Sequence, residues 1–151
     1  MIIRRLGPGD IALMRLLNAM FGAAFNEAQA YRDQAPGDNH LRAALAKPHV
    51  IALAACESEA VVGGLVAYEL NKLEKMSSEI YLYDLAVQAA QRRRGIATRL
   101  IAGLSDIARQ RGASTIFVQA DYGDEAAIAL YQKLGAREDV IHFDITTPRR
   151  G

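Results

Sequence analysis

The chain has 151 residues and a mass of 16.4 kDa, which is the size of one domain. With 51% hydrophobic residues, 23% charged residues and one cysteine, it is neither a disordered tail, nor a collagen-like rod, nor a disulfide scaffold. Its longest apolar runs, Val50–Cys56 and Val61–Ala67, are too short to cross a membrane. No apolar segment with a cleavage site follows Met1, so we expect a cytoplasmic protein with a single domain over residues 1–151.

The formal net charge is only +1, but the charges are unevenly distributed. Residues 91–111 contain six arginines against one acid, Asp106, whereas residues 113–144 contain six acids against Lys133 and Arg137. A basic segment beside an acidic one suggests two ligands of opposite charge. On charge alone, the better interpretation is that the basic and the acidic segment are simply two solvent-exposed faces.

In the N-terminal half, hydrophobic spacing and turn residues predict three strands and two helices. The expected elements are a strand over Ile2–Leu6, a helix from the N-cap Asp10 to about Phe25, a polar loop over 26–37, a helix capped by Asp38 that ends near Pro48, and strands over 49–56 and 61–70. The residues between the last two strands predict an antiparallel hairpin with a four-residue turn.

The C-terminal half continues with helices that end at glycines. The expected elements are a strand over Ser78–Val87, a helix from Gly95 to Arg111, a strand over Ser114–Ala120, a helix over Asp124–Leu134 and a closing strand over Val140–Ile145. Strands that first follow one another and then alternate with helices predict an α/β fold. Its mixed central sheet has helices on both faces.

The segment from Tyr83 to Leu100 has the pattern of a strand, a basic loop and the start of a helix. Free N–H groups in the first helical turn and the helix dipole form an anion site, which Gly95 leaves open to a ligand. The side chains of Arg92, Arg93 and Arg94 add positive charge. Because the loop lacks the residues of a nucleotide P-loop and of a dinucleotide fingerprint, we expect a phosphate-bearing ligand without NTP hydrolysis or hydride transfer.

The pattern Arg92-x-x-Gly95-x-Ala97, directly after a strand, resembles the acyl-CoA signature of the GNAT acyltransferase superfamily. Downstream, Ala127-Ile128-x-Leu130-Tyr131-x-Lys133-x-Gly135 resembles a second motif of that family. The resemblance implies one N-acetyltransferase domain over 1–151 with acetyl-CoA as cosubstrate and no metal. It implies that the coenzyme is held by Leu85, Ala86, Val87, Arg92, Arg93, Arg94, Gly95, Ile96, Ala97 and Thr98.

Two longer segments, Ser78–Val87 and Val118–Asp124, are similar to the aminoglycoside 3-N-acetyltransferases of the gentamicin-acetylating branch. Two shorter segments, Phe21–Gly22 and Ile51–Ala55, add to this likeness. The chain departs from the family pattern at Asp124, where most GNAT enzymes have asparagine. It also has room for only one strand after the last helix.

Asp84 interrupts an apolar face of its expected strand, which also carries Ile80 and Leu82. An unpaired carboxylate on such a face is destabilising, so it needs a partner, a water channel or a β-bulge that changes its direction. Judged from the residues alone, a purely structural role for Asp84 is as well supported as a functional one. The resemblance implies instead that Asp84 lies beside the amine that is acetylated.

Tyr131 lies in a helix with an apolar side, where packing is the commoner role of a tyrosine. The resemblance implies a position near the thioester sulfur. A phenol pKa of about 10 and a thiol pKa of about 8.5 make full proton transfer unfavourable by roughly 2 kcal/mol. We therefore expect Tyr131 to donate a hydrogen bond to the departing thiolate.

The acidic residues after the strand at 114–120 lie where α/β folds bind ligands. Asp124 as an N-cap and Glu125 in the first turn also satisfy ordinary helix rules. We expect the substrate to contact Asp84, Asp121, Tyr122, Asp124 and Glu125. The isolated residues His40, His49 and His142 do not have the spacing of metal ligands.

The resemblance implies transfer of the acetyl group of acetyl-CoA to the 3-amino group of an aminoglycoside, by direct attack of the amine on the thioester. This reaction inactivates the antibiotic. A polyamine or protein-amine N-acetyltransferase is an alternative, as is a non-catalytic acyl-CoA sensor. We expect a cationic small-molecule substrate, no nucleic-acid or membrane partner, and a homodimer that covers the edge left open by the short C-terminal end.

Overall fold

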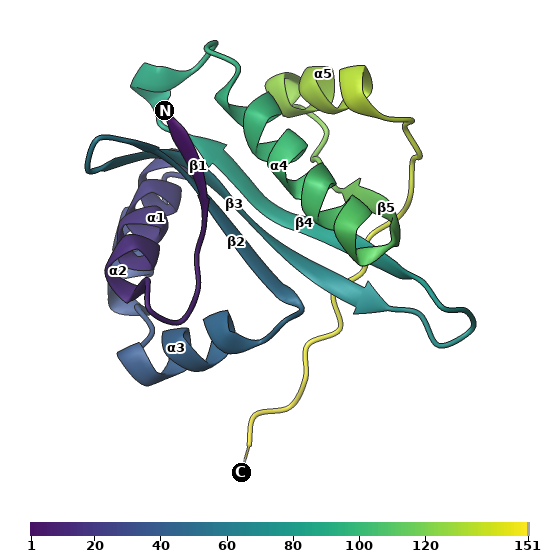
Figure 1. Cartoon of the computed structure of the whole chain (residues 1–151), viewed down its shortest axis with the longest axis horizontal. Coiled ribbons are helices and arrows are strands. Elements are labelled where there is room, and N and C mark those ends of the chain that lie inside the picture. The colour runs from purple at the N-terminus through teal and green to yellow at the C-terminus, as the bar shows by residue number, and fades with distance from the viewer. Residues whose placement is uncertain (151) are drawn as a thin grey trace. The chain divides into compact units, whose positions relative to one another are not determined.

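The computed structural model describes residues 1–150 and contains two compact units, Met1–Gln119 and the part of the chain that begins at Ala120 (Figure 1). The elements of the first unit are β1 (Ile2–Arg5), α1 (Ile11–Ala24), α2 (Ala28–Asp33), α3 (Asp38–Ala46), β2 (Val50–Glu57), β3 (Ala60–Asn71), β4 (Ser78–Val87), a 3-10 turn (Ala89–Gln91), α4 (Ile96–Arg111) and β5 (Ala113–Val118). The second unit contains α5 (Glu125–Leu134).

The first unit is built on one five-stranded sheet with the order β1-β2-β3-β4-β5. Strands β1 to β4 are antiparallel to their neighbours, whereas β5 is parallel to β4. Helix α4 forms the crossover between these two parallel strands, as such a connection requires. The mixed α/β sheet predicted from the sequence is therefore confirmed.

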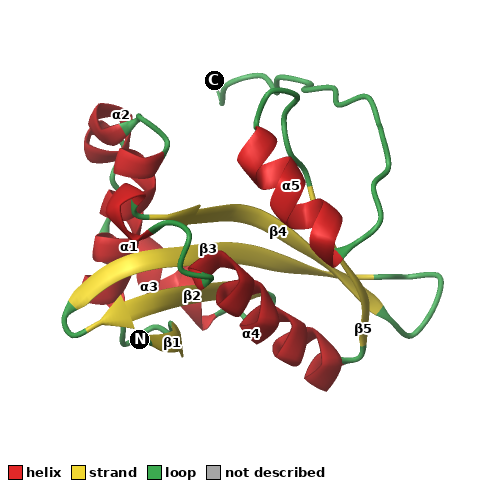
Figure 2. Ribbon diagram, turned by 90° about the horizontal axis from the view of Figure 1, so that it is seen from above, coloured by secondary structure: helices red, strands yellow, loops and turns green. Residues whose placement is uncertain are grey.

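Two neighbouring glycines of β3 show that α1 and α4 cover opposite faces of this sheet (Figure 2). A Cβ atom on Gly63 would meet Ile96 of α4, and a Cβ atom on Gly64 would meet Leu17 of α1. Successive side chains of a strand point to opposite faces, so the two helices lie on different sides. The α1 side holds a core cluster to which α3 also contributes Leu41.

Each of the two long helices buries one face. Met14, Leu17 and Phe21 of α1 are buried and recur at intervals of three and four residues, whereas Ile11 on the same stripe is only partly buried. On the opposite face, α4 buries Leu100 and Leu104. Its end at Gly112 is also confirmed, because this glycine adopts the left-handed conformation (φ 71°) of a helix C-cap.

Three local predictions are wrong. The polar segment 26–37 contains the short helix α2, and the β2–β3 hairpin turns over two residues, Ser58 and Glu59, instead of four. Asp38 is the first residue of α3 and Gly37 is the N-cap. Asp10 is the N-cap residue of α1, as predicted, but its side chain makes no capping bond, because its carboxylate accepts hydrogen bonds from Gly7 N and Arg4.

The closing strand predicted over Val140–Ile145 is absent. Residues 135–150 contain neither helix nor strand. The four large apolar side chains of this segment are 70–90% exposed; they belong to Val140, Ile141, Phe143 and Ile145. A strand pattern alone does not form a strand, because its backbone groups need a neighbouring strand to pair with.

Candidate active site

A β-bulge in β4 determines the direction of Asp84. In the β3–β4 ladder Asp84 pairs with Val66, whereas Leu82 pairs with Ala67, so Tyr83 is an extra residue in β4. A bulge changes which face of the sheet the following side chains occupy. Of the three solutions that the sequence left open for this carboxylate, the structure contains the bulge.

Asp84 consequently lies on the face of the sheet that α1 covers. Its partner Val66 pairs in turn with Ala52, and both belong to the apolar cluster around α1. Ala86 packs against the same cluster. In a regular strand, Asp84 would instead share the opposite face with Leu82, which is 2% exposed.

The electrostatic environment of Asp84 is negative. Burial raises the pKa of Asp84 above its ordinary value of 3.8, and the carboxylate of Glu27 raises it further. Among residues 1–150, no lysine or arginine forms an ion pair with Asp84. Two phenols face the same charge: burial and Asp84 together raise the pKa of Tyr31 and the pKa of Tyr68. The surroundings of Asp84 therefore favour a cation.

Glu27 and Tyr31 are held beside this site by a close approach of α2 to α1. A Cβ atom on Gly22 would lie 3.1 Å from the Cβ and Cγ atoms of Tyr31. The peptide N–H of Glu27 donates to the carbonyl of Gly22 at 2.8 Å, and Tyr31 N donates to Glu27 O at 3.0 Å. Neither residue is predicted from the sequence, because both lie in the segment expected to be a loop. Gly22 stands out in the sequence only through its likeness to relatives.

The end of β4 extends beyond its parallel neighbour. Pairing with β5 stops at Leu82, opposite Val118, and residues 83–87 continue without a strand on that side among the described residues. These include Leu85, Ala86 and Val87, which the resemblance assigned to the coenzyme. The side chain of Arg92 donates from Nε to Val87 O at 3.4 Å and so connects the following loop to the strand end.

The loop before α4 has two residues in the left-handed region, Arg93 (φ 65°) and Gly95 (φ 75°). The first bond of the helix runs from Arg99 N to Gly95 O at 3.0 Å. No partner within residues 1–150 accepts a hydrogen bond from the N–H groups of Ile96, Ala97 and Thr98. This is the open first turn that the sequence predicted.

The three arginines of the loop differ in their partners. Arg94 forms an ion pair with Glu57 at 2.6 Å and also contacts Gln91. The pair raises the pKa of Arg94 and lowers that of Glu57. Within the described chain, Arg92 and Arg93 have no carboxylate partner. Their charges are therefore more available to an anion than that of Arg94.

The second unit contains the other candidate residues. Asp124 caps α5 by accepting a hydrogen bond from Ala127 N at 3.2 Å, as predicted. Tyr131 is partly buried, and burial together with the charge of Asp124 raises its pKa. Since Asp84 belongs to the first unit and Tyr131 to the second, their meeting at the thioester stays a prediction.

Tyr122 has local partners that the sequence did not reveal. Its hydroxyl donates to Asp139 Oδ1 at 3.1 Å, and the guanidinium of Arg137 lies 5.7 Å from the centre of its ring. Arg137 also donates to Asp139 at 3.1 Å. The side chains of Asp121 and Glu125 are exposed. Substrate contact at these positions stays a prediction.

Among residues 1–150, no three histidine, cysteine, aspartate or glutamate side chains come together as a group that could hold a metal ion. None of the helices in this part of the chain has the length and hydropathy that a membrane-spanning segment requires.

Solved structures of aminoglycoside acetyltransferases are similar to this chain over nearly its whole length. One, from an uncultured soil metagenomic sample, is 52% identical with a TM-score of 0.95, and the match covers 97% of this chain and 98% of that chain. A second, also from an uncultured soil metagenomic sample and in complex with sisomicin, is 30% identical with a TM-score of 0.89 and coverages of 97% and 96%. The likeness to aminoglycoside acetyltransferases that was noted in the sequence is thus confirmed.

Among curated proteins, the ribosomal protein bS18-alanine N-acetyltransferase of Escherichia coli (strain K12) is 30% identical over 79 residues. That match covers 52% of this chain and 52% of the relative, so it spans about half of the relative's length. The model of the acetyltransferase (GNAT) family, whose cosubstrate is acetyl-CoA, matches residues 11–136. The match includes the bulged strand, the basic loop and α5, and the chain belongs to the GNAT family of acetyltransferases.

Proposed function

We propose that this acetyltransferase transfers the acetyl group of acetyl-CoA to the 3-amino group of an aminoglycoside and thereby inactivates the antibiotic. The observation that carries the proposal is the near full-length similarity to two aminoglycoside acetyltransferases, one of them in complex with sisomicin. Asp84 and Glu27, with no basic partner for Asp84 in the described chain, fit a substrate with several ammonium groups. Asp121, Tyr122, Asp124 and Glu125 would contact other parts of the same polycation.

Acetyl-CoA would bind where β4 extends beyond β5. Backbone groups of Leu85, Ala86 and Val87 would pair with the pantetheine arm as with an added strand. The N–H groups of Gly95, Ile96, Ala97 and Thr98 would hold the pyrophosphate together with the side chains of Arg92 and Arg93. Arg94, already paired with Glu57, would support the shape of the loop.

In the reaction, the amine nitrogen attacks the thioester carbonyl carbon, the C–S bond breaks, and coenzyme A leaves as a thiolate. An alkylamine with a pKa near 10.4 is protonated at neutral pH and must first lose a proton. Asp84, directly or through one water, accepts it, and the raised pKa of Asp84 makes this carboxylate a stronger base than usual. A backbone N–H near Val87 would stabilise the oxyanion.

Tyr131 would act on the leaving group. Its raised pKa makes it a weaker acid than a free phenol, so a hydrogen bond to the thiolate fits better than early proton transfer. After the attack the nitrogen loses a second proton, and the departing thiolate takes up one proton to become a thiol. Each turnover thus converts an ammonium and acetyl-CoA into an amide and coenzyme A thiol and releases one proton to solvent. Acetylation also removes a positive charge from the substrate, which weakens its attraction to the acidic site and favours release.

A second candidate function is acetylation of a protein or peptide amine, which the partial match to an alanine N-acetyltransferase favours. The purified protein should be mixed with acetyl-CoA and, separately, gentamicin, spermidine or a peptide with N-terminal alanine, and thiol release followed. Turnover with gentamicin alone, and a product acetylated at the 3-amino group by NMR, supports the proposal. Turnover with the peptide or spermidine alone supports the alternative, and coenzyme binding without any turnover supports a sensor.

A further inference from the structure

Aromatic side chains form a continuous cluster across the three neighbouring strands β3, β4 and β5. Tyr68 pairs with Tyr81 in the β3–β4 ladder, and Tyr81 pairs with Phe117 in the β4–β5 ladder. The rings of Tyr81 and Phe117 are stacked, with their centroids 4.7 Å apart. Tyr83, the extra residue of the bulge, makes T-shaped ring contacts with Tyr68 at 5.7 Å and with Tyr81 at 5.4 Å. We refer to these four residues as the aromatic cluster.

The aromatic cluster lies on the same face of the sheet as Asp84. Tyr68 follows Val66 by two residues in β3, so the two side chains point to the same face, and Val66 is the ladder partner of Asp84. Burial and the charge of Asp84 raise the pKa of Tyr68, whereas burial, Tyr83 and Asp84 together raise the pKa of Tyr81. Both phenols are therefore neutral at physiological pH, and both lie within the electrostatic range of the carboxylate.

The ring of Tyr83 is held by its aromatic neighbours but is open to solvent. The residue is 60% exposed. Along residues 1–150 its hydroxyl forms no hydrogen bond, whereas the hydroxyl of Tyr81 donates to Gln119 Oε1 at 2.9 Å. The cation–π contact found in the described chain joins Arg137 to Tyr122, and no arginine or lysine there lies over the ring of Tyr83. Tyr83 is therefore able to accept a cation from a ligand.

The surroundings of Tyr83 suit an organic ammonium group. The face of an aromatic ring carries partial negative charge and attracts a cation, and the attraction is stronger where water is excluded. The carboxylates of Asp84 and Glu27 add full negative charges, and Asp84 has no basic partner among residues 1–150. An ammonium group on a carbon framework can contact a ring and a carboxylate at once.

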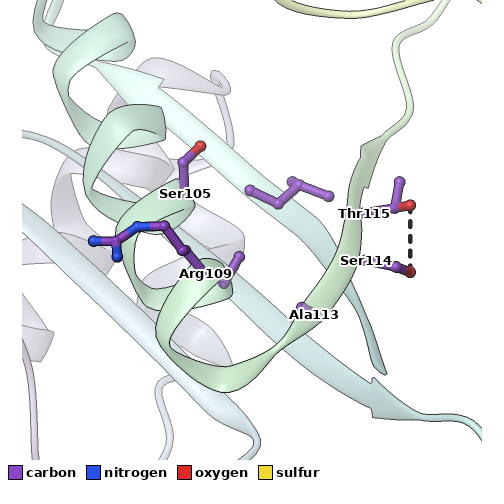
Figure 3. Close-up of a pocket in the computed structure, with 7 residues that line it drawn as sticks. Ser105, Arg109, Ala113, Ser114 and Thr115 are labelled. Atoms are coloured by element: carbon purple, nitrogen blue, oxygen red, sulfur yellow. Dashed lines mark hydrogen bonds between the residues drawn. The ribbon is translucent and has the colours of Figure 1, made fainter. Parts of the chain in front are cut away.

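A groove between α4 and β5 lacks both of these features (Figure 3). Its volume is about 310 Å³, and its lining includes Ser105, Arg109 and Thr115 but neither an aromatic ring nor a carboxylate. The side chain of Arg109 is 75% exposed, so its charge repels an ammonium group. A cationic ligand is thus drawn to the face of the aromatic cluster and not to this groove.

We propose that Tyr83 determines the specificity for the amine: its ring binds a second, still charged ammonium group of the substrate, while Asp84 takes the proton from the group that is acetylated. The attacking nitrogen must lose its positive charge before it reacts, so a cation–π contact to that nitrogen is lost. A contact to a neighbouring ammonium group persists throughout the reaction. Diamines and polyamines are therefore preferred over amines with one cationic group. This inference rests on the proposed function for the reaction at Asp84.

The first test is steady-state kinetics with gentamicin as the acceptor. Tyr83→Leu removes the ring and should raise KM about 3- to 30-fold, the range of a cation–π contact, with kcat within about twofold of wild type. Tyr83→Phe retains the ring and should restore the low KM. Ser105→Leu is the matched control, because it places a leucine at an exposed position of α4, which covers the other face of the sheet. A wild-type KM in Tyr83→Leu, or an equal loss in Tyr83→Phe, would overturn the inference.

The second test measures cation binding without acetyl transfer. Tetramethylammonium chloride is titrated into the protein, with sodium chloride at the same concentration as the reference. The chain contains six tyrosines and no tryptophan, so its near-ultraviolet absorbance reports the surroundings of tyrosine rings. We expect a saturable change in the wild-type protein and about 3- to 30-fold weaker binding in Tyr83→Leu. No saturable change, or equal binding in both proteins, contradicts the inference.

The two tests distinguish a failure of this inference from a failure of the proposed function. Tetramethylammonium has no N–H group and cannot be acetylated, so its binding at Tyr83 is measurable even if gentamicin is not a substrate. Conversely, gentamicin acetylated with the same KM by the wild-type protein and by Tyr83→Leu would overturn the role of Tyr83 and leave the proposed function intact.

Discussion

Asp84 lies opposite Val66 in the β3–β4 ladder, one residue out of the register that Leu82 and Ala67 establish. The shift moves the carboxylate from the α4 face to the α1 face of the sheet, where Glu27 acts on it. It occurs next to the end of the β4–β5 pairing, where β4 becomes free on its other side. The proposed base and the proposed coenzyme strand are therefore adjacent parts of one element.

The first prediction concerns Asp84→Asn, which keeps the shape of the side chain and removes the base. We expect kcat for gentamicin to fall by roughly 100-fold or more, the range of general-base catalysis. The Kd of coenzyme A, measured by calorimetry, should not change. Asp106→Asn, on the exposed surface of α4, is the matched control. Activity of Asp84→Asn within about twofold of wild type would exclude Asp84 as the base.

The second prediction is the pH dependence of activity. Because burial and Glu27 raise the pKa of Asp84, kcat/KM should decline with falling pH at a higher pH than an ordinary carboxyl with a pKa of 3.8 would produce. Glu27→Gln removes the neighbouring charge and should move this decline to lower pH, while the shape of the side chain is kept. An unchanged profile in Glu27→Gln would show that Glu27 does not act on the titrating base.

The third prediction is the stability of the same Asp84→Asn variant. A carboxyl whose pKa is raised on folding destabilises the folded state once the pH exceeds its unfolded pKa, and this penalty is absent at lower pH. Asp84→Asn should therefore raise the Tm at pH 7 and have a smaller effect below pH 3.8. A Tm that falls by the same amount at both pH values would indicate a structural role for Asp84.

The fourth prediction is that Tyr131→Phe slows the chemical step. A hydrogen bond to a charged group contributes about 1.5–3 kcal/mol, which corresponds to a roughly 10- to 150-fold lower kcat. The Kd of coenzyme A should stay the same, because the hydroxyl is expected to act on the departing sulfur. A change confined to Kd or Tm would instead assign Tyr131 to binding or packing.

Elements with a strong local pattern were predicted well. The bounds of β4 are those expected from its apolar run, and α4 ends at Gly112, as expected, because glycine readily adopts a left-handed conformation. The bulge at Tyr83 could be anticipated only as one of several solutions, since a register is a property of two strands together. The sequence of one strand shows only how its own side chains alternate, and it does not show where the partner strand pairs with it.

Residues held by tertiary packing were not found from the sequence. α2 is short and polar, and it forms where Gly22 lets it approach α1, so Glu27 and Tyr31 gave no periodic signal. The opposite error occurs at Val140–Ile145. Its clear strand pattern predicts a strand, but no strand pairs with this segment among residues 1–150. In both cases the deciding partner lies far away in the sequence.

The last prediction concerns the two adjacent glycines of β3, which should fail in different ways when replaced by alanine. On Gly64 a Cβ atom would lie 2.3 Å from Leu17 Cδ1 and 2.8 Å from the backbone oxygen of Leu53, so Gly64→Ala should destabilise the fold by about 1–3 kcal/mol. On Gly63 it would lie 3.0 Å from the Ile96 side chain, at the start of α4. Gly63→Ala should thus weaken coenzyme A binding more than it lowers Tm.

The matched control is Gly9→Ala, because no atom lies within 4 Å of a Cβ at that position. Chemical denaturation measures the stability of the three variants, and calorimetry measures their affinity for coenzyme A. The Gly63 contact reaches the helix turn whose N–H groups are proposed to hold the pyrophosphate. In Gly63→Ala, the Kd for the coenzyme should therefore rise more than the KM for the amine. If Gly63→Ala binds coenzyme A as tightly as Gly9→Ala does, the first turn of α4 is not the phosphate site.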